Sequence, residues 1–234
     1  MAQGKDRQTG DSYLDSYVVK YQKWLSEGMI GNASKVLPVR TALEAKQWIL
    51  PTEQTITYLR QAEKIALTDC ACRVHYGRCD KPTRVCLLFD ETAEQAVAMK
   101  GADLVSAREA EKTIQVADEA GLVHMTLYAR QDRPFAICNC CSCCCHDLQL
   151  LLRHGRVNLT LRSDYVAVTD AEKCVECGQC SERCMFGARR IEGGKLVRDA
   201  SACYGCGLCV SVCPTGATTM VLREDVVLAE GKRA

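Results

Sequence analysis

The stretch CVECGQCSERC at residues 174–184, followed by CYGCGLCVSVCP at residues 203–214, decides the character of this chain. Each run has the spacing Cys-x2-Cys-x2-Cys-x3-Cys, and Pro214 follows the last cysteine of the second run. This spacing is typical of thiolates that hold a [4Fe–4S] cube, because three thiolates so spaced can wrap one loop around a cube and bind three of its irons. The doublet therefore predicts two cubes.

The fourth iron of each cube is expected to take its thiolate from the other run, which ties the two halves together. One expected ligand set is Cys174, Cys177, Cys180 and Cys213, and the other is Cys203, Cys206, Cys209 and Cys184. Gly178, Gly205 and Gly207 suit the tight turns, since glycine adopts positive φ without a steric penalty. Structural zinc and disulfides are the alternatives, and two complete four-cysteine runs argue against both.

The segment from about Tyr165 (YVAVTDAEKC) to Leu222 (ATTMVL) resembles the bacterial two-cluster ferredoxins over roughly a quarter of the chain. The resemblance implies one-electron transfer at low potential. The chain departs from that family at Met185, where the family has a proline after the fourth cysteine of the first run. We therefore expect the potential of the nearer cluster to differ from the family norm.

Composition favours reduced, metal-binding thiols. The 234 residues contain 18 cysteines, far more than packing requires. We see no signal peptide at MAQGKDRQTG and no apolar run near the ~18 residues of a transmembrane segment, so we expect a cytoplasmic protein. A net charge of +1 and the lack of an aromatic stacking motif argue against nucleic acid as a partner. No phosphate-binding or dinucleotide fingerprint is present, so ATP or NAD is not expected either.

The expected fold is α+β, with a small helix/strand cysteine-rich domain followed by the two-cluster ferredoxin-like domain. We place an amino-terminal amphipathic helix within residues 1–30, the cysteine-rich domain at 31–160 and the ferredoxin-like domain with its tail at 161–234. The first helix, DSYLDSYVVKYQKWLSEG, has apolar residues at steps of three and four. Its stripe either packs on the protein's own core or docks another subunit through Tyr13, Tyr17, Tyr21 and Trp24.

Further elements are predicted between the first helix and the ferredoxin-like domain. Thr52 caps an expected helix, and Ser106 with Glu109 forms a capping box for a helix over 107–120. Other helices are expected at 91–100 and 146–155, and strands at 65–70 and 122–129. A winged-helix-like arrangement of these elements is one option.

Ten more cysteines lie in the cysteine-rich domain, and they are Cys70, Cys72, Cys79 and Cys86, followed by Cys138, Cys140, Cys141, Cys143, Cys144 and Cys145. Because neighbouring side chains point apart, the six-cysteine run should serve more than one cluster or leave spare thiols. We favour two further [4Fe–4S] clusters, held by the first four cysteines and four of the six. The alternatives are one cluster with free thiols, a larger cluster, or zinc.

Charged residues and histidines lie among these cysteines. Arg73, Arg78, Lys81 and Arg84 would offset the negative charge of a thiolate-ligated cluster, unless they form a surface loop. His75 and His146 could replace a thiolate, but a hydrogen-bonding role is the better expectation. His124 and His154 are expected to be structural.

The combination of CxCR, GLVH and CNCCSCCC ahead of a two-cluster segment resembles a group of ferredoxin-domain proteins from anaerobes, which implies a redox subunit without naming a substrate. We therefore predict an iron–sulfur electron-transfer protein, as the relay subunit or dedicated donor of a larger anaerobic oxidoreductase. Single electrons would pass along about four clusters to a redox partner's flavin, metal or cluster. The alternatives are a redox enzyme with an open iron, and a redox or iron sensor; a non-catalytic subunit is favoured over an enzyme.

Overall fold

The computed structural model describes residues 9–27, 34–37, 59–128, 134–155 and 160–224. Most of the helix expected after Thr52 lies outside these residues, and residues 59–61 near its end are helical. The described part mixes helices and strands, which confirms the α+β prediction. Among the described helices, none is both long and apolar enough to cross a membrane.

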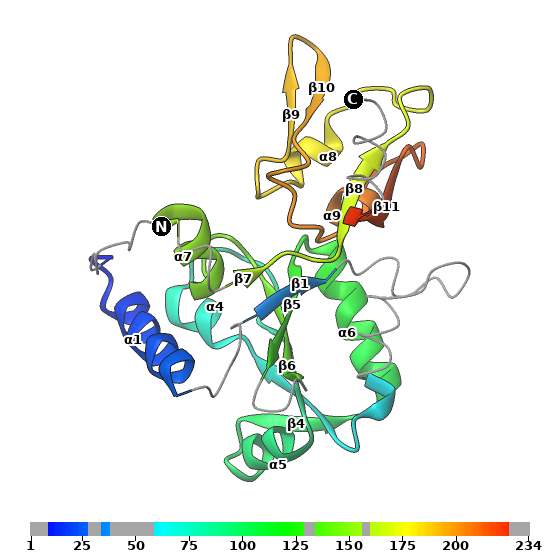
Figure 1. Cartoon of the computed structure of the whole chain (residues 1–234). Coiled ribbons are helices and arrows are strands. Elements are labelled where there is room, and N and C mark those ends of the chain that lie inside the picture. Colours follow the sequence, from blue (N-terminus) through cyan, green and yellow to red (C-terminus); the bar gives the residue numbers. More distant parts are fainter. Residues whose placement is uncertain (1–8, 28–33, 38–58, 129–133, 156–159, 225–234) are drawn as a thin grey trace.

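A seven-stranded sheet forms the centre of the cysteine-rich domain, in the order β4-β2-β3-β6-β5-β1-β7 (Figure 1). Neighbouring strands are antiparallel, except that β1 and β7 are parallel. The sheet differs from the winged-helix-like option. Its strands are β1 (Ser34–Leu37), β2 (Ile65–Asp69), β3 (Arg84–Phe89), β4 (Ala102–Val105), β5 (Val123–Tyr128), β6 (Pro134–Cys140) and β7 (Thr160–Leu161).

One face of the sheet packs on α6 (Ala107–Glu119), which lies along the sheet in Figure 1. Ser106 and Glu109 form the expected capping box at its start. Ile114 of this helix packs with Leu87 of β3 and Ile137 of β6, which are paired residues. Because side chains alternate along a strand, Cys86 and Cys138 point to the opposite face. The sheet therefore separates this aliphatic core from Cys86 and Cys138.

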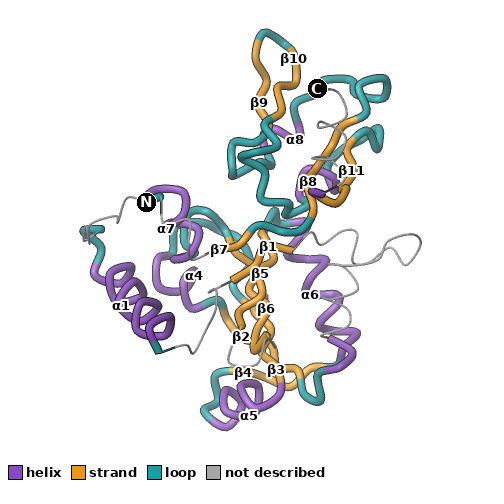
Figure 2. The backbone as a smooth tube through the Cα atoms, viewed as in Figure 1, coloured by secondary structure: helices purple, strands orange, loops and turns teal. Residues whose placement is uncertain are grey.

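The cysteine-bearing face is covered by α4 (Ala71–Tyr76), α7 (His146–His154) and α1 (Ser12–Ser26), while α5 (Asp90–Ala98) lies at the far end of the sheet (Figure 2). Leu14 and Tyr21 of α1 are buried against Leu150 of α7. Tyr13 stacks on His75, with ring centroids 3.9 Å apart, and Tyr17 stacks on His146 at 3.7 Å.

For the three tyrosines the structure therefore supports the alternative in which this stripe packs on the protein's own core. Their rings are used within the chain, because the histidines of α4 and α7 offer flat partners that bury them. The side chain of Trp24 lies outside the description.

The C-terminal segment contains two small antiparallel sheets and two short helices. The elements are β8 (Tyr165–Thr169), α8 (Gln179–Glu182), β9 (Arg189–Glu192), β10 (Lys195–Arg198), α9 (Leu208–Ser211) and β11 (Thr218–Leu222). Strand β8 pairs with β11, and β9 pairs with β10. The segment lies against one end of the large sheet (Figure 1).

Specific contacts hold the two parts together. Arg183 donates hydrogen bonds to the carbonyl oxygens of Asp118 and Glu119 at the end of α6, at 3.0 and 2.9 Å. Gly121 lies so close that a Cβ there would be 2.6 Å from the Arg183 guanidinium. The parts therefore pack together, as expected from the short linker between them.

Candidate metal centres

Two small pockets in the C-terminal segment are each lined by four cysteines. The outer pocket is lined by Cys174, Cys177, Cys180 and Cys213, and the inner pocket by Cys184, Cys203, Cys206 and Cys209. Each pocket thus brings three cysteines of one run together with the last cysteine of the other. These are the two sets that we expect to act as ligands.

The backbone around these pockets depends on glycine. Gly178 and Gly207 have φ of 81° and 79° and stand directly before α8 and α9. Gly205 has φ of 73°, and a Cβ there would lie 2.2 Å from the Tyr165 carbonyl oxygen. Only glycine allows this close approach, which carries the loop around the inner pocket.

In the inner pocket four thiols lie close together with little access to solvent. Burial raises the pKa of Cys206, and the neighbouring Cys209, Cys203 and Cys184 thiolates raise it further. Four thiolates so close together need positive charge from a metal centre to remain ionised. The donor set therefore fits an iron–sulfur cube, in which all four ligands are thiolates.

Comparison with known families agrees with this geometry. Residues 173–217 match the 4Fe-4S dicluster domain. We call these residues the dicluster segment. No curated protein matches the chain.

Met185, where the chain departs from the ferredoxin pattern, faces the cysteine-rich domain. Met185 and Phe186 pack against a hydrophobic cluster that contains Val123 and Met125 of β5. Phe186 also stacks on Tyr204, with ring centroids 4.6 Å apart. The residues that follow Cys184 therefore build the contact between the two parts of the molecule.

Six cysteines of the cysteine-rich domain form what we call the six-cysteine ring. Two lie just after β2 and in α4, one lies on β3, two lie on β6, and one lies directly before α7. In order around the ring they are Cys70, Cys72, Cys145, Cys140, Cys138 and Cys86. Each thiol interacts with the next, and Cys86 interacts again with Cys70. Five of the six are buried, and Cys138 is partly buried.

The thiols of the ring shift one another's pKa. Interactions with the thiols on either side lower the pKa of Cys70, Cys145 and Cys138. Interactions with the same neighbours, together with burial, raise the pKa of Cys72, Cys140 and Cys86. A metal that binds these sulfurs would hold them as thiolates, which are the form that binds metal.

Arg73 supplies a buried positive charge beside the ring. Its side chain is 1% exposed and donates to the carbonyl oxygens of Pro82 at 2.6 Å and Asn139 at 2.8 Å. Although burial lowers the pKa of Arg73, the nearby Cys70 and Cys141 thiolates more than offset this and raise it. As expected, this arginine offsets the negative charge of the thiolates.

The other basic residues of this region divide in their roles. Arg84 is exposed and forms ion pairs with Asp69 and Asp103, so it is a surface residue. Lys81 donates to the Ala120 carbonyl. For these two positions the surface-loop alternative describes the structure better.

His146 lies at the edge of the ring. Its Nδ1 is 2.9 Å from the Cys72 sulfur, and its Nε2 is 2.6 Å from the Tyr21 hydroxyl. The histidine therefore connects a ring sulfur with the first helix through hydrogen bonds, as the sequence favoured. His124 is buried beneath α6 against Asn139, and burial lowers its pKa to about 3, so it is neutral and structural.

The remaining four cysteines form a second, tighter set, which we call the four-cysteine group. It consists of Cys79, Cys141, Cys143 and Cys144, whose sulfurs all lie within 4.8 Å of one another. The run at 138–145 is therefore divided between two sets, as the alternating directions of neighbouring side chains predict. Cys79 leaves the other three early cysteines and joins this group.

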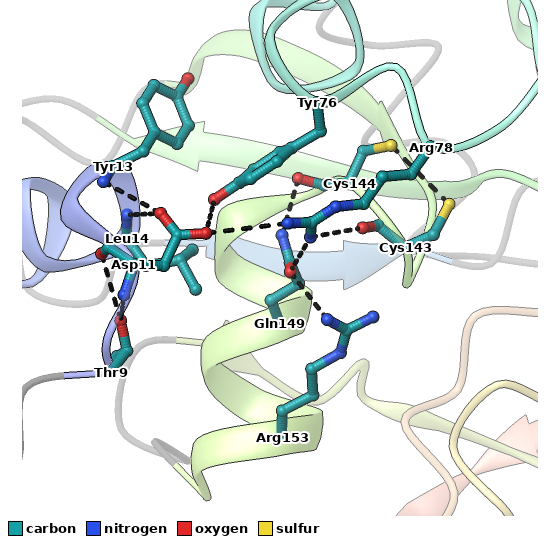
Figure 3. Close-up of polar contacts among 10 residues, drawn as sticks. All are labelled: Thr9, Asp11, Tyr13, Leu14, Tyr76, Arg78, Cys143, Cys144, Gln149 and Arg153. Carbon is teal, nitrogen blue, oxygen red and sulfur yellow. Dashed lines mark hydrogen bonds and ion pairs between the residues drawn. The ribbon is translucent and has the colours of Figure 1, made fainter.

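Figure 3 shows how the start of the chain supports the four-cysteine group. Arg78 donates to the Cys143 carbonyl at 3.3 Å and to the Gln149 side chain at 2.7 Å. Asp11 lies 3.8 Å from the Arg78 guanidinium and accepts a hydrogen bond from the Tyr76 hydroxyl at 2.8 Å. Hydrogen bonds from Tyr76 and from backbone N–H groups keep the pKa of Asp11 low despite the opposing effect of burial.

Proposed function

We propose that this chain is an iron–sulfur electron-transfer protein, the relay subunit or dedicated donor of a larger anaerobic oxidoreductase. The proposal rests on one observation. A hydrophobic cluster lies between the inner pocket and the six-cysteine ring. It contains Cys140 and Cys145 of the ring together with Tyr204 and Leu208 of the dicluster segment. Cys206 and Cys138 pack against the same cluster.

A cluster in the ring would therefore lie across one packed layer of side chains from the inner cube. Close packing shortens the path that an electron has to cross and fixes the separation of the two centres. The stacked rings of Phe186 and Tyr204 lie in the same layer. The arrangement supports electron transfer between the dicluster segment and the cysteine-rich domain.

The outer pocket is the end that faces solvent. Cys177 is exposed, and Val175 beside it is 64% exposed. Electrons would be exchanged here with a redox partner that carries a flavin, a metal or another cluster. Single electrons would hop between the outer cube, the inner cube and the ring and be exchanged with redox partners at the ends of this path, each step oxidising one centre by one electron and reducing the next.

The proposed cofactors are two cubes in the dicluster segment and a third cluster in the ring. A cube uses four thiolates, so two of the ring's six cysteines would remain beside it as hydrogen-bonding neighbours. Cys70, Cys72, Cys86, Cys138, Cys140 and Cys145 are the candidate ligands. A cytoplasmic location fits these reduced thiols.

Burial of the ring favours a relay over a catalytic centre. Cys70, Cys72, Cys86, Cys140 and Cys145 are each at most 8% exposed. A substrate that binds an open iron needs access to the metal, whereas an electron does not. The enclosed ring is therefore better suited to outer-sphere electron transfer.

The direct test is to follow an electron between the two parts. The anaerobic protein is mixed with less than one equivalent of a one-electron reductant, frozen at intervals and examined by EPR. In the wild type the electron should reach the ring cluster and distribute according to the midpoint potentials. In Cys206→Ser, which alters the inner pocket, the outer cube should be reduced while the ring cluster is reduced much more slowly.

Met99→Ala is the control, because it replaces a 77% exposed side chain outside the proposed path and should leave the transfer unchanged. Transfer that is equally fast in Cys206→Ser and wild type would contradict the relay, and so would a wild type without a third cluster.

A further inference from the structure

The four-cysteine group differs from the other sulfur sets in its dimensions. The Cys79 and Cys141 sulfurs are 3.9 Å apart, and those of Cys143 and Cys144 are 3.8 Å apart. Four sulfurs bound tetrahedrally at about 2.3 Å from one ion lie about 3.8 Å from each other. The group therefore has the size of the coordination sphere of a single ion.

A cube requires a wider set of ligands. Each thiolate of a cube binds a different iron and lies outside the iron–sulfide core, so the thiolate sulfurs are farther apart than around one ion. Within the described residues, the four-cysteine group is the one set of three or more such ligand atoms that closes to within 4.8 Å. The eight cysteines of the dicluster segment and the six of the ring stay more open, although they too converge.

A two-iron cluster also fits poorly. Such a cluster has two thiolates on each iron, so the two pairs of sulfurs are separated by the irons and the bridging sulfides between them. In the four-cysteine group all four sulfurs lie within 4.8 Å of one another, so they do not divide into two separated pairs. This compact arrangement suits one metal centre.

The surroundings suit an ion held by four thiolates. Cys141 and Cys144 are 2% and 0% exposed, and they pack among Val85, Ala117 and Leu122. A divalent ion with four thiolates has two net negative charges. Arg73 interacts with Cys141, and Arg78 donates to the Cys143 carbonyl, so two cations lie beside the group.

The positions of the four cysteines in the chain indicate what such an ion would do. Cys79 comes from the loop between α4 and β3, and the other three come from the turn between β6 and α7. The same turn carries Cys140 and Cys145 of the ring at its two ends. An ion here would tie both segments together and fix the ring cysteines on either side of it.

We propose that Cys79, Cys141, Cys143 and Cys144 bind one Zn²⁺ ion as a closed structural site. The four thiolates leave no open position, as in a structural zinc site. Zinc is preferred over iron because such a site binds Zn²⁺ more tightly than Fe²⁺. The proposal stands whether or not the chain carries electrons, because it concerns sulfurs outside the relay path.

The test uses the whole protein, purified anaerobically from cells grown with excess iron. We expect one zinc per chain, and zinc-edge X-ray absorption should show a single shell of four sulfurs at about 2.3 Å. Wild-type absorption does not depend on the folding of any variant. Iron bound at this group, zinc ligated by nitrogen or oxygen, or a zinc-free protein would overturn the proposal.

Two matched variants locate the ion. Cys79→Ser should lose zinc and keep the iron of the dicluster segment, while Cys206→Ser, which alters the inner pocket, should lose iron and keep its zinc. Zinc retained in Cys79→Ser with its sulfur shell intact would overturn the site. Failure of the relay experiment would not affect these outcomes.

Discussion

The dicluster segment and the cysteine-rich domain both collect cysteines, but they do so by different means. In the dicluster segment, regular spacing and glycine turns wrap each loop around its pocket, so the sets can be identified in the sequence. In the cysteine-rich domain, Cys86 and Cys138 meet because β3 and β6 pair in one register on one face of a sheet. Spacing along the chain contains little information about such a set.

The difference also appears in the dimensions of the sites. The cysteine-rich domain contains both an open ring and a compact group, and cysteines of one continuous run belong to both. Adjacent residues Cys140 and Cys141 belong to different sets, since one ends a strand and the other begins a turn. A single run of cysteines can therefore contribute to two separate sets.

The largest effect is expected from a substitution in a glycine turn of the dicluster segment. Gly205→Ala places a Cβ 2.2 Å from the Tyr165 carbonyl oxygen and 2.7 Å from the Ser163 Cβ at a φ of 73°. The loop has to move, so we expect loss of iron from the inner pocket and destabilisation of several kcal/mol. Iron analysis and denaturant unfolding measure both effects.

Gly216→Ala is the matched control. Its φ is 64°, and nothing lies within 4 Å of the added Cβ. It should cost only the left-handed strain of about 1–2 kcal/mol and keep its iron. Equal iron loss in both variants would show that the close approach at Gly205 is unimportant.

The next effect concerns the buried charge of the cysteine-rich domain. Arg73→Leu removes the guanidinium that bonds Pro82 and Asn139 and faces the thiolates. Loss of one partner from a buried charged set costs about 3–5 kcal/mol. The midpoint potential of the ring cluster should also fall, because a nearby positive charge stabilises the reduced state.

Denaturant unfolding and EPR-monitored redox titration test this prediction. Arg84→Leu provides the control, since this exposed arginine forms surface ion pairs worth about 0–1 kcal/mol and an exposed hydrogen bond to the Leu67 carbonyl. An unchanged potential in Arg73→Leu would mean that Arg73 does not act on the cluster.

A substitution in the contact between the dicluster segment and the cysteine-rich domain should have a smaller effect on stability. Met185→Ala removes a partly buried side chain from the hydrophobic cluster that joins them. We expect a loss of about 1–2 kcal/mol, less than the 2–5 kcal/mol of a fully buried methionine, and slower electron transfer to the ring. Stopped-flow reduction and thermal unfolding compare it with Met99→Ala, a 77% exposed methionine that should change neither.

The smallest expected effect lies at the first helix. Tyr21→Phe removes the hydroxyl that lies 2.6 Å from His146 Nε2, which should cost about 0.5–1.5 kcal/mol. Tyr13→Phe removes a less buried hydroxyl, which has a weaker contact with Tyr17 at 3.4 Å and an interaction with Cys72, and should cost less. Thermal unfolding of the two variants ranks them, and the opposite order would contradict the role given to Tyr21.

Much of the fold could be predicted from the sequence where local signals were strong. The capping box at Ser106, the aromatic face of the first helix and the two pocket sets of the dicluster segment all follow from short-range patterns. Strand β6 was not predicted, because a run of cysteines does not show the alternation of apolar and polar residues that marks a half-buried strand. Helix α4 was missed for a similar reason, being one short element between cysteines.

The partners of the ten extra cysteines could not be predicted, because they depend on how β2, β3 and β6 pair. The roles of the basic residues were equally hidden. Arg73 and Arg84 have the same charge in the same cysteine-rich stretch, yet one is buried beside thiolates and the other is on the surface. Only the position of each residue relative to the sheet distinguishes them.

The most direct test of this account is the amount of iron and acid-labile sulfide per chain in anaerobically purified protein, with EPR of the reduced sample. The account predicts about twelve irons and about twelve sulfides, as three cubes would require, and three interacting reduced-cluster signals. About eight irons would contradict a cluster in the six-cysteine ring and end the proposed relay at the inner pocket. About sixteen would place a cube in the four-cysteine group and contradict the division of the cysteines between two kinds of metal site.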